Sequence, residues 1–412
     1  MRFPLSLTLK IARTILKHRL KGTRRFATVL QLEPLHACNL ACTGCGRIRE
    51  YAASMKESMP LEDCLAAAAE CDAPMVSICG GEPLIYPQIA ELVAGLHAQR
   101  RIVYLCTNAL LMRRKMRECL AVQWARDPSR MEPLVGRLLT ENLISSQEAT
   151  DIRKRVKAPA KAVIEPSPWF YWNVHLDGLE ATHDRSVERE GVFRECIQAI
   201  RMAKHMGFQV ATNTTVYKET NMEEIEDLFV FLSSFGVDGH TVSPGYDFGD
   251  AGKDMLLRLK KRPEDFFLTR AATIKKFQNA EQWGRRFPLL GTPVYLEFLA
   301  GKRDLACSAW AIPTRNVRGW KGPCYLITDT HYSSYAELLR ATDWSRLGRV
   351  DGEAQDPRCE HCMVHCGYEP TASLGIGAVR GDTLKNIRFN FGPRPRVKLH
   401  PVNAFNGATG KP

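Results

Sequence analysis

Short apolar runs rich in β-branched residues alternate along the chain with longer stretches that have helical periodicity. The expected strands are residues 29–35, 75–79, 102–107, 170–176, 209–215 and 239–243. Helical patterns lie between them at 61–71, 88–98, 192–206 and 222–235. This alternation predicts parallel strands joined by right-handed crossovers. The pattern therefore predicts an α/β fold with a partial (βα)6 barrel.

Polar side chains follow several of these expected strands. Cys106 and Asn108 lie at the end of the third strand, Asp177 follows the fourth, and Asn213 lies within the fifth. Ligands of parallel α/β folds bind at the carboxyl ends of the strands, so we expect these groups around one binding mouth. Each also suits a turn or a helix cap, and both interpretations stay open.

The first segment of the chain predicts an amphipathic helix. Its apolar positions recur at steps of three and four residues: Leu5, Leu9, Ala12, Leu16 and Leu20. Residues 1–26 also carry eight lysines and arginines and no acid, most of the formal net charge of +12. Such a helix suits the surface of an anionic membrane, and it equally suits packing on the protein itself. A second basic stretch, residues 380–398, is expected to join the same face.

Length and composition predict one large core with a smaller appended unit, because the chain has 412 residues of which 45% are hydrophobic. We expect a basic helix at 1–26, a barrel at 27–300, a cysteine-rich module at 301–378 and a basic tail at 379–412. Nucleic acid would also attract the positive charge, but no RNA-binding motif accompanies it, so no nucleic-acid partner is expected.

The connection between the third and fourth expected strands is unusually long. Residues about 112–166 form an insertion with two expected helices, 133–141 and 145–156. The second helix begins with the capping box Ser145-x-x-Glu148. An insertion beside the strand ends suits a lid or a docking site, and it also suits an inert surface hairpin.

Cysteine usage indicates a reducing compartment. The chain has 14 cysteines and no recognisable signal peptide, which favours metal ligation over disulfides. No apolar run reaches the roughly 18 residues that a membrane span needs. We therefore expect a cytoplasmic protein that associates peripherally with the inner face of the membrane.

Three of these cysteines form the run CNLACTGC. Cys38, Cys42 and Cys45 have the spacing C-x3-C-x2-C, which lets one loop bind three irons of a four-iron cluster and leave the fourth iron open. A structural zinc with His36 as fourth ligand and unrelated buried thiols are the alternatives. The first interpretation predicts a cluster with a free coordination site.

The cysteine loop and the segment Gly80-Gly81-Glu82-Pro83 resemble the radical S-adenosylmethionine (SAM) superfamily. That resemblance implies a 4Fe-4S cluster on the three cysteines and SAM on its open iron. It also implies that Gly80, Gly81 and Glu82 receive the SAM amino group. By the same resemblance, the other SAM contacts are Asn108, Asp177 and Asn213. One departure is Gly44, where the superfamily often has an aromatic residue, so another group must pack against the adenine.

Further stretches resemble the adenosylhopane synthase family of bacterial hopanoid synthesis, among them VYLCTNALL, VHLDG, VDGHTVSPGY, PTRNVRGW and CMVHCGYEPTA. This resemblance implies a transferase that adds the 5′-deoxyadenosyl radical to the terminal alkene of a hopene, diploptene, giving adenosylhopane. It also implies an apolar triterpene partner, a membrane surface and an electron donor such as flavodoxin or ferredoxin. The insertion at about 112–166 is a departure from the family pattern, so a different isoprenoid substrate is an alternative.

Addition to an alkene leaves a tertiary radical that must gain a hydrogen atom or an electron and a proton. Cys106 is the candidate donor, because a thiol has a weak S–H bond and this one ends a barrel strand. The other interpretation of Cys106 is a small buried apolar residue without a chemical role.

Alternate members of the aromatic run 169–172 are expected to line an apolar tunnel.

Cysteine density rises again near the end of the chain. The candidates for a second site are Cys307, Cys324, Cys359, Cys362 and Cys366. They look like a shortened auxiliary-cluster module, which would carry one further 4Fe-4S cluster and pass on an electron. A zinc site with His361 or His365 and free thiols are the alternatives.

The rival functions for the whole protein are a radical SAM enzyme that modifies peptides and an iron–sulfur electron carrier.

Overall fold

The computed structural model describes residues 4–155, 162–247 and 250–405. Its centre is a nine-stranded sheet with the order β6-β5-β4-β3-β2-β1-β7-β8-β9. The strands β1 to β6 are all parallel, with registers such as Leu30 opposite Val76. They are β1 (Val29–Leu32), β2 (Met75–Ile78), β3 (Ile102–Thr107), β4 (Phe170–His175), β5 (Gln209–Val216) and β6 (Gly239–Pro244). The predicted α/β fold with six parallel strands is confirmed.

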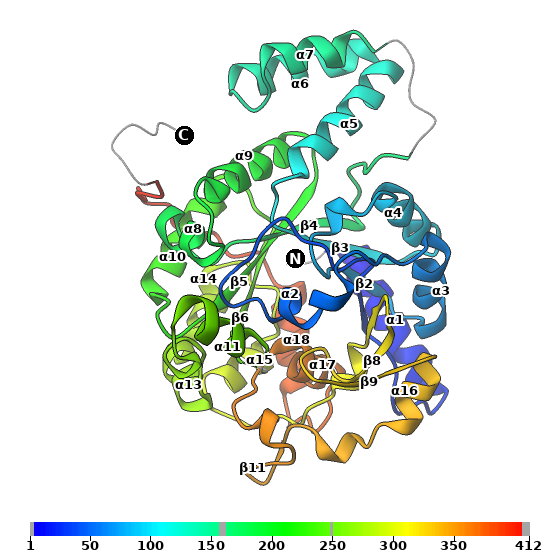
Figure 1. Ribbon diagram of the computed structural model, residues 1–412, viewed down its shortest axis with the longest axis vertical. Helices are drawn as coiled ribbons and strands as arrows, with labels where there is room; N and C mark the ends of the chain where they lie inside the picture. The colour runs from blue at the N-terminus through cyan, green and yellow to red at the C-terminus, as the bar shows by residue number, and fades with distance from the viewer. Residues whose placement is uncertain (1–3, 156–161, 248–249, 406–412) are drawn as a thin grey trace.

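Helices cover the outside of this sheet (Figure 1). The crossover helices are α3 (Leu61–Cys71), α4 (Ile89–Ala98), α5 (Met112–Arg126), α8 (Glu180–Ser186), α9 (Val192–His205) and α10 (Met222–Ser234). The largest buried aromatic side chains, among them Phe170, Trp172 and Phe208, pack between β4, β5 and the helices. Burial of these side chains supplies the main driving force for folding.

Three further strands continue the sheet beyond β1, which the hydrophobic pattern did not predict. They are β7 (Thr314–Asn316), β8 (Gly319–Pro323) and β9 (Thr328–Tyr332). β7 runs parallel to β1, and β8 and β9 follow as antiparallel neighbours. The cysteine-rich part of the chain therefore shares one sheet with the barrel. A separate hairpin pairs β10 (Arg349–Val350) with β11 (Glu353–Ala354).

The remaining helices belong mostly to the second half of the chain. They are α2 (Gly46–Glu50), α11 (Asp250–Asp254), α12 (Pro263–Phe266), α13 (Arg270–Phe277), α14 (Ala280–Arg286), α15 (Pro293–Leu299), α16 (Tyr335–Ala341), α17 (His365–Leu374) and α18 (Asp382–Phe391). Figure 1 shows α17 and α18 below the middle strands, in the same half of the molecule as α1.

The insertion projects from the opposite end of the molecule (Figure 1) and contains α6 (Pro128–Thr140) and α7 (Ser146–Arg153). The capping box is confirmed: Ser145 Oγ accepts from Glu148 N at 3.1 Å, and Glu148 accepts from Ser145 N at 2.8 Å. The expected start at Pro133 is wrong, because Asp127 caps the helix and Pro128 occupies its first turn. The expected end at 156 lies outside the described residues.

Helix α1 (Leu5–Leu20) has two apolar faces rather than one. Leu7 is fully buried and packs with Ile11 against Tyr104 and Tyr171, where the strands begin. The predicted stripe of Leu5, Leu9, Ala12, Leu16 and Leu20 is exposed instead. The helix is therefore anchored on the barrel by a face that the stripe does not include.

Candidate functional site

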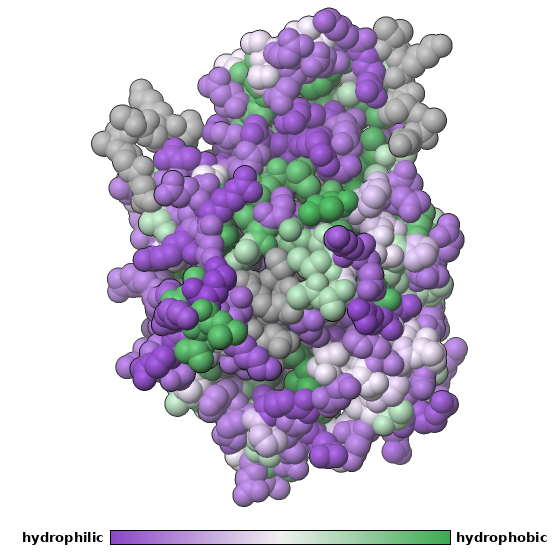
Figure 2. Space-filling view, in the orientation of Figure 1, coloured by the Kyte–Doolittle hydropathy of each residue, from purple (hydrophilic) through white to green (hydrophobic). Residues whose placement is uncertain are grey.

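A cavity of about 890 Å³ runs inside the barrel. Its wall includes all the residues predicted to bind the first cluster and SAM, together with Cys106: Cys38, Cys42, Cys45, Gly80, Gly81, Glu82, Cys106, Asn108, Asp177 and Asn213. These residues come from segments spread over more than 170 positions of the chain, from 38 to 213. Figure 2 shows hydrophobic residues gathered near the centre of this face, with hydrophilic residues around them.

The cysteine loop follows β1 and leads into α2. Its three thiols border the cavity, and burial raises the pKa of Cys38 to about 11 in the absence of a metal. The Cys45 backbone N–H donates to the Cys42 carbonyl, and Thr43 N donates to Ser186 O on α8 at 3.0 Å. The loop is thus closed by an internal hydrogen bond and held at α8, and its donor set of three cysteines around one cavity fits a four-iron cluster with an open iron.

The segment Gly80-Gly81-Glu82 packs against the strand that enters the cysteine loop. Gly81 N donates to Leu35 O, and Glu82 N donates to Ala37 O at 2.8 Å. A Cβ atom on Gly81 would lie 1.9 Å from the Ala37 oxygen, and Gly80 has φ +108°. Only glycine permits this approach, so the two glycines fix the spacing between the β2 loop and the cysteine loop.

Glu82 is buried and joins two strand ends. Its carboxylate accepts from Leu84 N at 3.0 Å, Thr107 Oγ1 at 2.8 Å and Asn108 N at 2.9 Å. Burial outweighs these hydrogen bonds and raises its pKa to about 7. Each carboxylate oxygen has two lone pairs, so capacity for an ammonium donor remains.

Asn108 connects the end of β3 to the cysteine loop, because its Nδ2 donates to Asn39 Oδ1 at 2.7 Å.

Asp177 connects β4, β5 and α8. It accepts from Ser186 Oγ at 2.6 Å and Thr215 N at 2.9 Å, and its Oδ2 lies 2.9 Å from His175 Nε2. Burial favours the neutral acid, but His175, His183 and Ser186 together outweigh burial, and the pKa of Asp177 is lowered. Asn213 lies opposite His175 in the parallel register.

Tyr217, which follows β5, was not singled out in the sequence. Its ring borders the cavity and fills the space beside Gly44, where a Cβ atom would lie 2.1 Å from Tyr217 Oη. The ring also stacks on Phe266 with centroids 4.2 Å apart. Tyr217 therefore supplies an aromatic surface beside the cysteine loop at the position where Gly44 lacks one.

The aromatic run 169–172 does not line the cavity, so that expectation is wrong. Phe170 and Trp172 point toward the outer helices, where they pack edge-on at 4.9 Å. Tyr171 stacks on Tyr104 at 4.7 Å near the start of the strands. β4 contributes to the cavity wall further along, through Asn173 and His175.

Cys106 borders the middle of the cavity. Its Sγ lies 3.3 Å from Ser77 Oγ and accepts from Asn173 Nδ2 at 3.3 Å. Burial raises the pKa of the thiol more than these hydrogen bonds lower it. The residue therefore keeps its S–H proton near neutral pH, in a position that faces the cavity.

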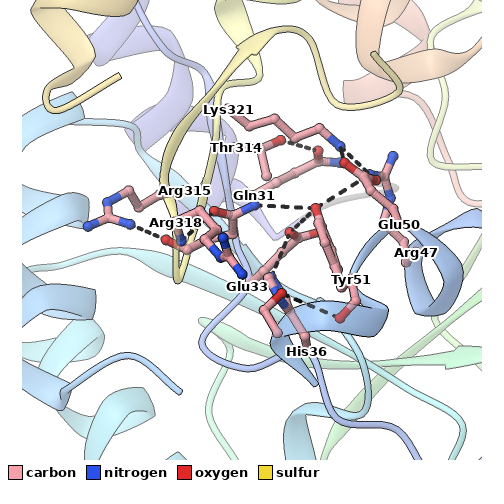
Figure 3. Close-up of polar contacts among 12 residues, drawn as sticks. Gln31, Glu33, His36, Arg47, Glu50, Tyr51, Thr314, Arg315, Arg318 and Lys321 are labelled. Atoms are coloured by element: carbon pink, nitrogen blue, oxygen red, sulfur yellow. Dashed lines mark hydrogen bonds and ion pairs between the residues drawn. The ribbon is translucent and has the colours of Figure 1, made fainter. Parts of the chain in front are cut away.

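A buried polar network joins α2, the helix after the cysteine loop, to β7 and β8 (Figure 3). Tyr51 Oη donates to Glu33 at 2.7 Å, and the buried Lys321 lies 2.8 Å from Glu50 at the end of α2. His36 stacks on Tyr51 at 3.6 Å, and its Nδ1 lies 2.8 Å from Ser54 Oγ. His36 thus belongs to this network, with one ring nitrogen engaged by Ser54.

The five candidate cysteines of the C-terminal part come together in one region, where Cys359 and Cys366 are buried and the other three are partly buried. Cys307 and Cys366 each interact electrostatically with Cys324 and Cys362, and Cys359 interacts with Cys324. They come from three segments of the chain, at 307, at 324 and at 359–366, which β8, α17 and the intervening loops bring together. Four or more thiols around one site form a donor set that fits a second iron–sulfur cluster.

No three Cys, His, Asp or Glu side chains in the described ranges are arranged to hold a single metal ion. His365 Nδ1 instead lies 2.6 Å from Ser243 Oγ.

No described residue of the insertion lines the cavity. Its α5 end is tied to α9 by Arg113, which pairs with Glu195 at 2.6 and 2.7 Å. The lid interpretation of the insertion therefore has no contact to support it in the described part of the chain.

Comparison with known families gives two matches. Residues 32–123 match the model of the radical SAM superfamily, and residues 240–384 match a domain of unknown function, DUF3463. The first match contains the cysteine loop, the Gly-Gly-Glu segment and Cys106. A search of curated proteins finds no match.

Solved structures with a related fold include Streptococcus suis SuiB bound to its precursor peptide SuiA, at 14% identity and a TM-score of 0.52. The alignment covers 86% of this chain and 75% of that one. Two other SuiB structures, one bound to SAM, align with TM-scores of 0.36 and identities of 17% and 18%. They cover 55% and 57% of this chain, and this chain spans only 42% and 43% of theirs.

The match over residues 32–123 and the site together define the class: this part of the chain is a radical SAM domain, and the fold agrees with that class. Enzymes of this superfamily use a 4Fe-4S cluster and SAM, and the matched residues include the cysteine loop and the Gly-Gly-Glu segment. The structure places all of the predicted residues for these two cofactors around one cavity.

Proposed function

We propose that this enzyme adds a 5′-deoxyadenosyl group to the terminal alkene of a hopene such as diploptene and releases adenosylhopane. The observation that carries the proposal is the cavity. It has the cofactor residues at one end and apolar side chains such as Ile11, Leu289 and Ile387 toward the other. A long apolar polycycle is a substrate that such a space suits, because its burial releases water from a large apolar surface.

Cys38, Cys42 and Cys45 would hold the cluster, and Gly80, Gly81, Glu82, Asn108, Asp177 and Asn213 would hold SAM. When bound, these cofactors supply a primary carbon radical and methionine after one-electron reduction. We assign the adenine contact to Tyr217, which adds to the set taken from the sequence. A flavodoxin or a ferredoxin would be the electron donor.

The chain's own residues complete the reaction. A new carbon–carbon bond at the unhindered alkene carbon leaves one unpaired electron on the tertiary carbon. Cys106 would donate its hydrogen atom to that carbon and become a thiyl radical. One electron from the external reductant and one proton from solvent then restore the thiol. Ser77 and Asn173 position the sulfur for this transfer.

Cys307, Cys324, Cys359, Cys362 and Cys366 would bind a second 4Fe-4S cluster. The polar network around Glu50 and Lys321 lies between this region and the cysteine loop and holds the two in a fixed relation. The enzyme would act in the cytoplasm, on the inner face of the membrane.

The test is anaerobic incubation of reduced, cluster-loaded protein with SAM, with and without diploptene. Adenosylated lipid that appears only with diploptene supports the proposal. Formation of 5′-deoxyadenosine without any lipid adduct would contradict the substrate and favour the alternatives, another isoprenoid or a peptide. Absence of both products would contradict radical SAM activity itself.

A further inference from the structure

The cavity extends along the whole length of the barrel strands. Beside β2 its wall includes Met75, the first residue of the strand, and Cys79, which follows the last. Beside β6 it includes His240 near the start and Gly245 after the end. The space therefore passes from the cofactor end of the barrel to the end where the strands begin.

Two amphipathic helices from opposite ends of the chain form the walls at that second end. α1 contributes Ile11, Ala12 and Leu16, and α18 contributes Ile387 and Phe391. Ala12, Leu16, Ile387 and Phe391 are exposed as well as bordering the cavity. The cavity wall is thus continuous with the outer surface between these two helices.

Apolar surface gathers around this opening. Nine of the thirteen large hydrophobic side chains that are exposed in the described part of the chain belong to α1 or to residues 376–391. They include Leu20, which is 79% exposed, and Val379, which is 61% exposed. Exposed apolar side chains concentrated on two segments that border one opening are typical of interaction sites.

Positive charge surrounds the same surface. Arg13, Lys21, Arg24 and Arg388 are exposed and have no ion-pair partner among the described residues. α1 contains no acid, and Asp382 at the start of α18 is paired with Arg303 at 2.7 Å. A partner that covers this surface must therefore offer both apolar groups and anionic ones.

We propose that the surface formed by α1 and residues 376–391 docks on an anionic lipid bilayer, and that the apolar substrate enters the barrel from the bilayer between α1 and α18. The route rests on the proposed function only in requiring an apolar substrate. Basic residues near an anionic leaflet and apolar side chains in its interface both favour this docking. The substrate then reaches the cofactors from the end opposite to them without passing through water.

Docking is tested by co-sedimentation of the full chain with phosphatidylcholine vesicles, with and without phosphatidylglycerol. Wild type should bind the anionic vesicles and lose binding at high salt. Leu20→Glu and Leu384→Glu should each lower the bound fraction at least about fivefold. Leu257→Glu changes an apolar side chain that is 72% exposed elsewhere and serves as the matched control. Equal binding by all three variants, or no binding by wild type, would overturn the docking.

The route is tested with Ala12→Trp, which places a large ring at the opening, and Ala271→Trp, which places one at an exposed alanine of α13. The readout is transfer of pyrene from vesicles to the protein, followed by fluorescence. Ala12→Trp should slow transfer at least about fivefold, whereas Ala271→Trp should not. Equal transfer by both would overturn the route. Because pyrene transfer needs no catalysis, absence of a hopene adduct would reject the proposed function and leave this result standing.

Discussion

The phenol of Tyr217 occupies the space that any side chain on Gly44 would need, with Tyr217 Oη 2.1 Å from the position of a Cβ atom there. The two residues are complementary: a small residue in the cysteine loop leaves room for an aromatic ring from the end of β5. The ring also borders the cavity beside Asp177 and Cys45. This pairing explains how the site replaces the aromatic residue that the loop lacks.

Tyr217→Ala should weaken SAM binding, because stacking of a base on an aromatic ring contributes about 1–3 kcal/mol. The dissociation constant, measured by calorimetry on cluster-loaded protein, should rise by roughly 5- to 150-fold. Tyr217→Phe keeps the ring and should stay close to wild type. An unchanged affinity in Tyr217→Ala would remove the ring from the SAM site.

Cys106→Ala should abolish most of the saturated adduct, at least about tenfold, because the tertiary radical loses its hydrogen source. SAM cleavage should continue, measured as methionine release. In D₂O the wild-type adduct should carry one deuterium at the tertiary carbon, since the thiol proton exchanges with solvent.

Cys64→Ala is the matched control for Cys106→Ala, because Cys64 is a fully buried thiol of α3 that does not border the cavity. It should leave the product unchanged. A normal yield of saturated adduct from Cys106→Ala would exclude the thiol as the donor.

Glu369 should make the protein less stable as pH rises. Burial raises the pKa of this carboxyl group from 4.5 to about 7, although Thr292 N donates to it at 2.9 Å. Between pH 4.5 and about 7 the folded state keeps a proton that the unfolded state releases, so the free energy of unfolding falls as pH rises. Above about pH 7 it stays at this lower value. Glu369→Gln should restore roughly 1–3 kcal/mol of the free energy of unfolding that wild type loses.

The measurement is thermal unfolding of both proteins at about pH 5 and about pH 8.5. Glu369→Gln should match wild type at the lower pH and unfold at a higher temperature at the upper pH. The same difference at both values would show that Glu369 does not titrate in this range.

The C-terminal cysteines should bind a second cluster. Anaerobically reconstituted wild type should contain about eight irons per chain, and Cys362→Ala with Cys366→Ala should leave about four. The same double substitution should retain the SAM-dependent change in the spectrum of the first cluster. About four irons in wild type, with no loss in the variant, would contradict a second cluster.

The sequence predicted the six parallel strands because each is a compact apolar run between helical patterns. The bounds of β3 and α3 agree with the expectation, and those of the other expected elements differ by one to a few residues. β7, β8 and β9 were not predicted, since short strands such as Gly319–Pro323 have no alternation and depend on pairing with neighbouring strands, here β7 and β9. Local propensity carries little information about such strands.

The cysteine loop and the Gly-Gly-Glu segment were found because their spacing is local. Tyr217 was missed because it lies 173 positions after Gly44, so no local pattern connects them. The aromatic run 169–172 was misassigned because strand alternation gives two faces and does not say which one points inward. The exposed stripe of α1 was identified, but the buried face with Leu7 depends on the barrel end that it covers.

The central claim is that the adenosyl carbon forms a bond to an apolar alkene. SAM with two deuterium atoms at C5′ tests it directly, with diploptene in anionic vesicles and product analysis by mass spectrometry. Addition predicts a lipid adduct that retains both deuterium atoms, with little free 5′-deoxyadenosine. Free 5′-deoxyadenosine that has gained a hydrogen atom from the substrate, without any adduct, would contradict the account.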